Sequence, residues 1–187
     1  MTGHAADTIE RRALELRAAA NGSRIEGYAA VFNSDSADLG GFVETIAPGA
    51  FASSLRRGDD VLALYDHDRR AILGRSTAGT LRLREDSKGL HFVLDVADTS
   101  AGRDVLESVG RGDITGASFG FRAVREKWTH GAPHRRELLE VDLLDVTVTP
   151  SPAYAATIVS RRSLDAVSGA DRRLRLLDLI GGRCALA

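Results

Sequence analysis

In this sequence of 187 residues, the strongest candidate for a catalytic nucleophile is Ser118, because of the residues around it. It lies in an alternating apolar stretch, between Gly116 and Gly120. Side chains alternate between the two faces of a strand, so both glycines share the serine's face and leave it without bulk. This arrangement suits the close approach of another backbone, such as a peptide substrate. The alternative is that the glycines mark bends of a barrel and that the serine is incidental.

His67 is the second candidate, because it lies just beyond the apolar stretch 61–65, between Asp66 and Asp68. Strand ends often present functional side chains, and flanking carboxylates can orient an imidazole. A histidine here could be a general base, a metal ligand or a solvated turn residue. No second histidine or cysteine stands nearby at ligand spacing, which argues against a metal site.

A third signal is an unusually acidic strand pattern that contains Glu140, Asp142 and Asp145. Glu140 and Asp142 share one face of this strand, and Asp145 takes the other. A serine hydroxyl becomes a useful nucleophile when a histidine takes its proton and a third group holds the imidazole. Ser118, His67 and one of the three acids could form that set. The pattern alone leaves the choice of acid open.

The elements that must position these residues are mostly strands. Apolar and alternating patterns predict strands at 24–32, 42–46, 61–65, 80–84, 90–96, 114–124 and 138–148. Short helices are predicted at 8–20, 48–55, 98–110 and 171–180. We therefore expect a mainly β fold with short helices, a closed or nearly closed β-barrel surrounded by helices. The expected parts are an N-terminal helical extension (1–23), a barrel domain (24–161), and a linker with a C-terminal helix (162–187).

Composition excludes several classes of function. The 25 Lys and Arg residues nearly balance the 26 Asp and Glu residues, so neither nucleic acid nor an acidic membrane surface is expected as a partner. Charges interrupt every long apolar stretch, so no membrane-spanning helix is expected, and the N-terminus lacks the pattern of a secretory signal. Cys184 is the single cysteine, which excludes a disulfide framework and suits a reducing cytoplasm.

Six short motifs, in one order, are similar to those of a known family. They are GYAAVFN (27–33), APGAF (47–51), YDHD (65–68), DSKGL (86–90), DTSAGRDVLESVGRGDITGASFGF (98–121) and EVDLLDVTVTPSPAY (140–154). Over about residues 24 to 160 the chain resembles the tailed-phage (caudoviral) prohead serine proteases, which are similar in fold to the herpesvirus assembly proteases. The resemblance implies a maturation serine endopeptidase inside the assembling prohead, in the host cytoplasm. Its partners would be the major capsid protein and its scaffolding segment, it would often cleave itself, and it would need no metal or organic cofactor.

The resemblance also implies roles for individual residues. His67 matches the family's histidine before an aspartate, and Ser118 matches the serine of its SFGF-like motif. In the herpesvirus relatives, the strand after the serine strand opens with a histidine followed by Val-x-Leu. Glu140 begins a stretch of that shape here, so Glu140 is the predicted third member of the triad. Asp142 is the first substitute and Asp145 the second.

The resemblance further places oxyanion donors around residues 147–151 and allows a homodimer through a C-terminal helix. Two other functions remain open at this point. One is a catalytically silent relative that binds coat protein as a scaffold or assembly partner, although both His67 and Ser118 are present. The other is an esterase, whose Gly-x-Ser-x-Gly turn requires a helix straight after the serine. The stretch 116–120 has that spacing but lies in an alternating strand pattern.

Overall fold

The computed structural model describes residues 9–14, 19–21 and 23–150 of the chain. In chain order the elements are β1 (Glu10–Leu14), β2 (Ala19–Asn21), β3 (Arg24–Val31), β4 (Phe42–Ile46), α1 (Ala52–Arg57), β5 (Leu62–Tyr65), β6 (Asp68–Arg75), β7 (Leu81–Glu85), β8 (Gly89–Asp95), α2 (Ser100–Arg111), β9 (Gly116–Thr129) and β10 (His134–Thr149). The fold is mainly β with few short helices, as the sequence predicts.

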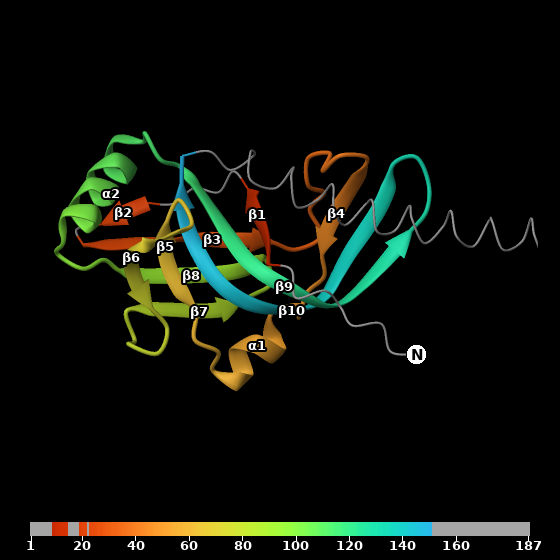
Figure 1. Cartoon of the computed structure of the whole chain (residues 1–187), viewed down its shortest axis with the longest axis horizontal. Coiled ribbons are helices and arrows are strands. Elements are labelled where there is room, and N and C mark those ends of the chain that lie inside the picture. The colour runs from red at the N-terminus through yellow and green to blue at the C-terminus, as the bar shows by residue number, and fades with distance from the viewer. Residues whose placement is uncertain (1–8, 15–18, 22, 151–187) are drawn as a thin grey trace, which may run out of the picture.

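Two sheets form this fold (Figure 1). The larger sheet has the strand order β1-β9-β10-β5-β6, with β4 also paired to β10, and the smaller has the order β2-β3-β8-β7. β9 and β10 form a long antiparallel pair that curves around the smaller sheet, so the larger sheet is a curled half-barrel. β4 and β5 pair in parallel with successive parts of β10.

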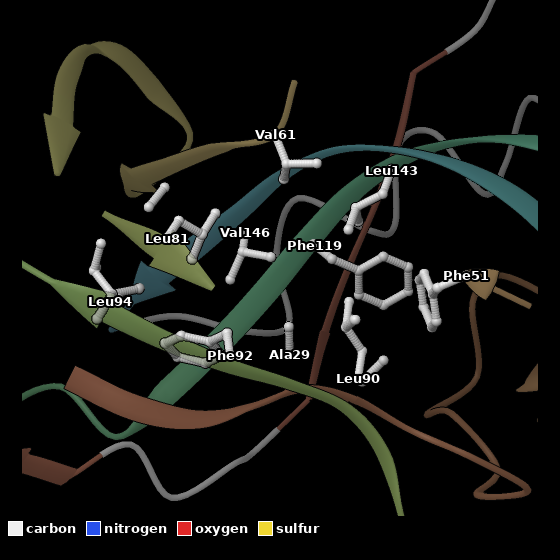
Figure 2. Close-up of a cluster of buried hydrophobic side chains, with 14 of the residues drawn as sticks. Ala29, Phe51, Val61, Leu81, Leu90, Phe92, Leu94, Phe119, Leu143 and Val146 are labelled. Carbon is white, nitrogen blue, oxygen red and sulfur yellow. The ribbon is translucent and has the colours of Figure 1, made fainter. Parts of the chain in front are cut away.

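The main hydrophobic core lies between the sheets (Figure 2). Phe119 of β9 meets the ring of Phe51 edge-on at a centroid distance of 5.3 Å. It also stacks on Phe121, two residues along the same strand, at 5.0 Å. Leu90 and Phe92 of β8 enter this core from the smaller sheet. The β9 face opposite Ser118 is therefore anchored by aromatic packing, which fixes the strand that carries the serine.

The middle of β10 has the α1 segment beside it in place of a strand. Between the part paired with β4 and the part paired with β5, the Val141 amide donates to the Ala50 carbonyl at 2.9 Å. The Leu143 amide donates to Ser54 Oγ at 3.1 Å. The pairing of β10 with β9 is irregular here, and one register shift lies between Leu143 and Asp145. This irregularity matters for the site.

The structure corrects part of the predicted element map. The predicted helix over 8–20 is wrong within the described residues, because Glu10–Leu14 and Ala19–Asn21 are strands of the two sheets. The described residues of 1–23 thus include one strand paired with β9 and one paired with β3. Pairing of β1 with β9 and of β2 with β3 overrides the local helical pattern, as tertiary contacts commonly do.

The other predicted elements up to residue 150 are confirmed to within a few residues, although β9 and β10 are longer than expected. The sequence pattern does not predict β6. α2 begins as expected, with Thr99 Oγ1 accepting from the Gly102 amide at 3.1 Å. The predicted helix 171–180 and the segment 162–187 lie outside the described residues. No helix in the described part of the chain is long and apolar enough to span a membrane.

Candidate active site

Ser118 lies on β9, the second strand from the β1 edge of the larger sheet, and on the face that the sequence predicts. It pairs with Thr147 of β10, and its neighbours Ala117 and Phe119 are buried in the core. The chain continues as a strand after Ser118 up to Thr129. The strand-to-helix turn of an α/β-hydrolase esterase is therefore absent at this serine, which removes that hypothesis.

His67 lies in the two-residue turn that joins β5 to β6. Tyr65 pairs with Asp68 across this turn, and its central residues, Asp66 and His67, have φ values of 47° and 57°. Two positive φ angles define the tight hairpin turn that matches the twist of its strands, at a conformational cost for residues other than glycine. The turn is tied to β10, because the Asp66 amide donates to the Val148 carbonyl at 3.0 Å. The turn, fixed by this hydrogen bond, thus holds the imidazole over the sheet.

The imidazole of His67 joins the serine to a carboxylate. Its Nε2 lies 2.8 Å from Ser118 Oγ, and its Nδ1 lies 2.8 Å from Asp145 Oδ1. The Asp145 side chain is 3% exposed and that of His67 is 12% exposed, so the chain of contacts is largely shielded from water. A hydroxyl, an imidazole and a carboxylate in this order form the arrangement that lets a serine act as a nucleophile.

The acid beside His67 is Asp145, the second substitute in the sequence prediction. The structure does not bring Glu140 to the histidine: Glu140 is part-exposed and faces Arg125, at 3.9 Å. The first substitute, Asp142, instead forms an ion pair with Arg57 of α1. The placement of Glu140 at the imidazole is therefore corrected in favour of Asp145.

A β-bulge explains why alternation alone points away from Asp145. Leu143 pairs with Phe121 and Asp145 pairs with the next residue of β9, Gly120, so β10 carries one extra residue here. This extra residue moves Asp145 from the core face to the face of Ser118. A Cβ atom at Gly120 would lie 2.2 Å from Asp145 Oδ2. Gly120 thus leaves room for the carboxylate, a use of the glycine that alternation does not predict.

Thr147 is a further residue of the site. It falls among the residues predicted to supply oxyanion donors, but its hydroxyl donates to Asp145 Oδ1 at 3.0 Å and lies 3.2 Å from His67 Nδ1. It is fully buried. Its position two residues after Asp145 puts it on the same face of β10, so alternation would find it once Asp145 is known. The hydroxyl helps to fix the carboxylate and the imidazole relative to each other.

β1 covers the serine. It pairs antiparallel with β9, with Arg12 opposite Phe119 and Ala13 opposite Ser118. Ser118 is 1% exposed, and its Oγ donates to the Arg12 carbonyl oxygen at 2.8 Å. A hydroxyl carries one hydrogen, so it cannot donate to this carbonyl and to His67 at the same time. The N-terminal strand therefore both shields the serine and competes with the imidazole for its proton.

The described residues contain no group of three or more histidine, cysteine, aspartate or glutamate side chains arranged to hold a metal ion. His91, which is buried, lies 3.0 Å from Glu26 and meets the ring of Tyr28 edge-on. These contacts place His91 in the smaller sheet, which does not contribute to the site.

Comparisons with known proteins bear on this geometry. Residues 7–169 match the family model described as caudovirus prohead serine protease. A search of the curated proteins gives no match. Among solved structures, the capsid assembly protease gp21 of bacteriophage T4 superposes with a TM-score of 0.51 at 12% sequence identity, covering 78% of this chain and 97% of the phage T4 chain. At that identity the likeness concerns the fold alone.

Proposed function

Because the chain belongs to the caudovirus prohead serine proteases, we propose that it is a capsid-maturation endopeptidase that cleaves the scaffolding segment of the major capsid protein inside the assembling prohead. His67, Ser118 and Asp145 are the proposed catalytic triad. The observation that carries the proposal is the single imidazole with a serine hydroxyl at 2.8 Å on one nitrogen and a buried carboxylate at 2.8 Å on the other.

In the proposed acylation step, His67 Nε2 takes the proton of Ser118 Oγ as the oxygen attacks the carbonyl carbon of the peptide bond. The C–N bond then breaks, and the imidazolium gives its proton to the leaving amine. Asp145 accepts the Nδ1–H hydrogen bond, which fixes the tautomer that leaves Nε2 free to accept. It also stabilises the positive charge that forms on the ring.

In the proposed deacylation step, water attacks the acyl ester on Ser118 while His67 acts again as general base. The C–O ester bond breaks, the new carboxyl end of the peptide departs, and the proton returns to Ser118 Oγ. The Thr147 hydroxyl keeps the Asp145 carboxylate in place through both steps. The pair of Asp145 and Thr147 thus orients the imidazole without contacting the substrate.

Self-cleavage is the second part of the proposal. The carbonyl in contact with Ser118 Oγ belongs to Arg12, so the bond between Arg12 and Ala13 is the one that we propose for self-processing. While β1 remains paired with β9, no other peptide strand can occupy that edge. Cleavage and departure of β1 would therefore precede cleavage of coat protein.

Co-expression with the cognate coat protein, followed by intact-mass measurement, tests the proposal. The wild-type chain should yield shortened coat protein and a shortened protease that begins at Ala13, whereas S118A should leave both chains at full length. The matched control is S53A, which removes another serine hydroxyl. Ser53 lies on α1, where its Oγ accepts from Arg57 of the same helix at 3.2 Å, and S53A should process normally.

Unchanged processing by folded S118A would remove Ser118 as the nucleophile. Full-length coat protein with the wild-type chain would instead favour the catalytically silent scaffold partner. Thermal unfolding of each variant shows whether a loss of processing comes from a loss of fold.

A further inference from the structure

A cluster of five charged side chains holds β1 in place, and all of them except the exposed Glu126 are buried. It comprises Glu10 and Arg12 of β1, Glu44 of β4, Glu126 of β9 and Arg136 of β10. We propose that Glu44 and Arg136 are specificity-determining residues that recognise peptide strands with a glutamate two residues before an arginine, cut after the arginine. This inference rests on the proposed peptidase function and names its substrate class.

Glu44 makes the contacts expected of an arginine-binding subsite. Its Oε1 accepts from Arg12 Nε at 2.5 Å and its Oε2 accepts from Arg12 Nη2 at 2.9 Å, a two-point match of carboxylate and guanidinium. The same guanidinium lies over the ring of Phe121, at 5.4 Å from its centroid. Both charged side chains are nearly inaccessible to solvent. The arginine whose carbonyl touches Ser118 is therefore the one that fills this subsite.

Arg136 makes the matching contacts to an acidic side chain. It binds both carboxylate oxygens of Glu10, one of them through Nη2 at 2.7 Å. Burial lowers the pKa of Arg136, but hydrogen bonds to Glu10 and the charges of Glu44, Glu10 and Glu126 outweigh it and raise the pKa, so the guanidinium stays charged. Glu10 and Arg12 lie two residues apart on one face of β1 and fill neighbouring positions.

These contacts belong to the edge that a substrate strand would use. Glu44 and Arg136 are on β4 and β10 and stay in the fold when β1 leaves, still linked to each other at 3.0 Å. Departure of β1 removes Arg12 from Glu44 and Glu10 from Arg136. Buried charges that lose partners are costly, so an incoming strand that supplies the same two charges is favoured over one that does not.

The sequence repeats this spacing immediately after β1. A glutamate followed two residues later by an arginine occurs twice in the chain, at Glu10–Arg12 and at Glu15–Arg17, and each arginine precedes an alanine. The N-terminal segment thus carries two copies of the side-chain pattern that the charge cluster accommodates.

Cleavage of two matched peptides by the wild-type chain, after self-processing has freed the edge that β1 occupies, tests the inference. One peptide has the sequence of residues 7–14, DTIERRAL, between a fluorophore and a quencher. The other replaces the second arginine by citrulline, which has nearly the same shape but no charge. We expect kcat/KM to be roughly thirtyfold or more higher for the arginine peptide, with the cut directly after that arginine by mass spectrometry.

Variants of the chain assign the preference to Glu44. E44Q should reduce the ratio between the two peptides to below about threefold, because its amide no longer attracts the guanidinium. D35N is the matched control, since Asp35 forms an exposed ion pair with Arg135, and it should keep the wild-type ratio. The comparison of peptides on the unaltered chain stands even if E44Q does not fold.

The outcomes separate the two levels of the proposal. Equal cleavage of both peptides, or a cut elsewhere, would overturn the recognition role while leaving the peptidase activity intact. Cleavage of neither peptide, together with unprocessed coat protein, would overturn the peptidase function and this inference with it. An arginine preference that survives in folded E44Q would show that another group reads the arginine.

Discussion

Replacing Gly120 by alanine should separate the fold of this protein from its activity. The new Cβ would lie 2.2 Å from Oδ2 and 2.8 Å from Cγ of Asp145, well inside contact distance. The obstructing atoms are the end of a side chain, so the carboxylate can turn away while both strands stay paired. That movement breaks the 2.8 Å contact with His67 Nδ1.

The size of the effect follows from the role of the carboxylate. Removing the acid of other serine-protease triads lowers kcat by about ten thousandfold or somewhat more. G120A displaces the acid without deleting it, so we expect kcat to fall by roughly a thousand to ten thousandfold. Alanine in place of a strand glycine gains about 0.5–1 kcal/mol of stability, which offsets part of the cost of moving the carboxylate. The melting temperature should therefore change by less than about 4 °C.

The assay is hydrolysis of the DTIERRAL peptide together with a thermal melt. G110A is the control, because a Cβ at Gly110 of α2 meets no atom within 4 Å beyond its own stretch of helix backbone, and it should keep full activity. Wild-type activity in folded G120A would refute the reasoning, because the carboxylate would then not be needed where the structure places it. Loss of the fold in G120A would instead show that β10 cannot yield at this position.

Three further outcomes are expected. T147V removes the hydroxyl that donates to Asp145 and should lower kcat for the same peptide by about tenfold. The pH profile of kcat should stay the same, and an unchanged kcat would contradict the positioning role. Burial raises the pKa of Glu10, but its two arginine partners outweigh burial and lower the pKa below the ordinary 4.5. The stability that this carboxylate gives β1 is therefore complete above about pH 4.5 and is lost as the pH falls through the lower pKa of the folded state. Hydrogen-exchange protection of β1, corrected for intrinsic rates, should drop only below pH 4.5. G89A should abolish folding, since its Cβ would lie 2.0 Å from the backbone oxygen of Ala30, which cannot turn away as a side chain can; soluble, folded G89A would contradict this.

Much of the fold could be predicted from the sequence because its strands alternate clearly. β9 shows two aromatic side chains on one face and glycines around Ser118 on the other, and the structure keeps this division. His67 could be found because it lies just after an apolar strand. β6 could not, since its polar start and its glycine hide any alternation. β1 has a helical pattern, and only its pairing with β9 makes it a strand.

The acid of the site is the hardest residue to predict. Alternation puts Asp145 on the core face with Leu143, and the extra residue that turns it to the other face has no mark in the sequence. Beside the bulge, Ser54 of α1 accepts the amide of Leu143. Such a contact between distant parts of the chain cannot be read from local pattern. The Glu-Val-Asp-Leu motif at 140–143 favours Glu140 by its likeness to the family's motif. A motif carries no information on how far Glu140 lies from His67 in the fold.

Covalent labelling of Ser118 tests the central claim most directly. A fluorophosphonate reacts with a serine that a histidine and an acid activate, and peptide mapping identifies the labelled residue. We expect wild-type chain to be labelled at Ser118, D145N to react at least about a thousandfold more slowly, and E140Q to react within about threefold of wild type. The three chains are compared in their unprocessed form, identified by intact mass, so that β1 covers the serine equally and the ratios report the acid alone. Labelling of D145N at the wild-type rate, or a large loss in E140Q instead, would contradict the account.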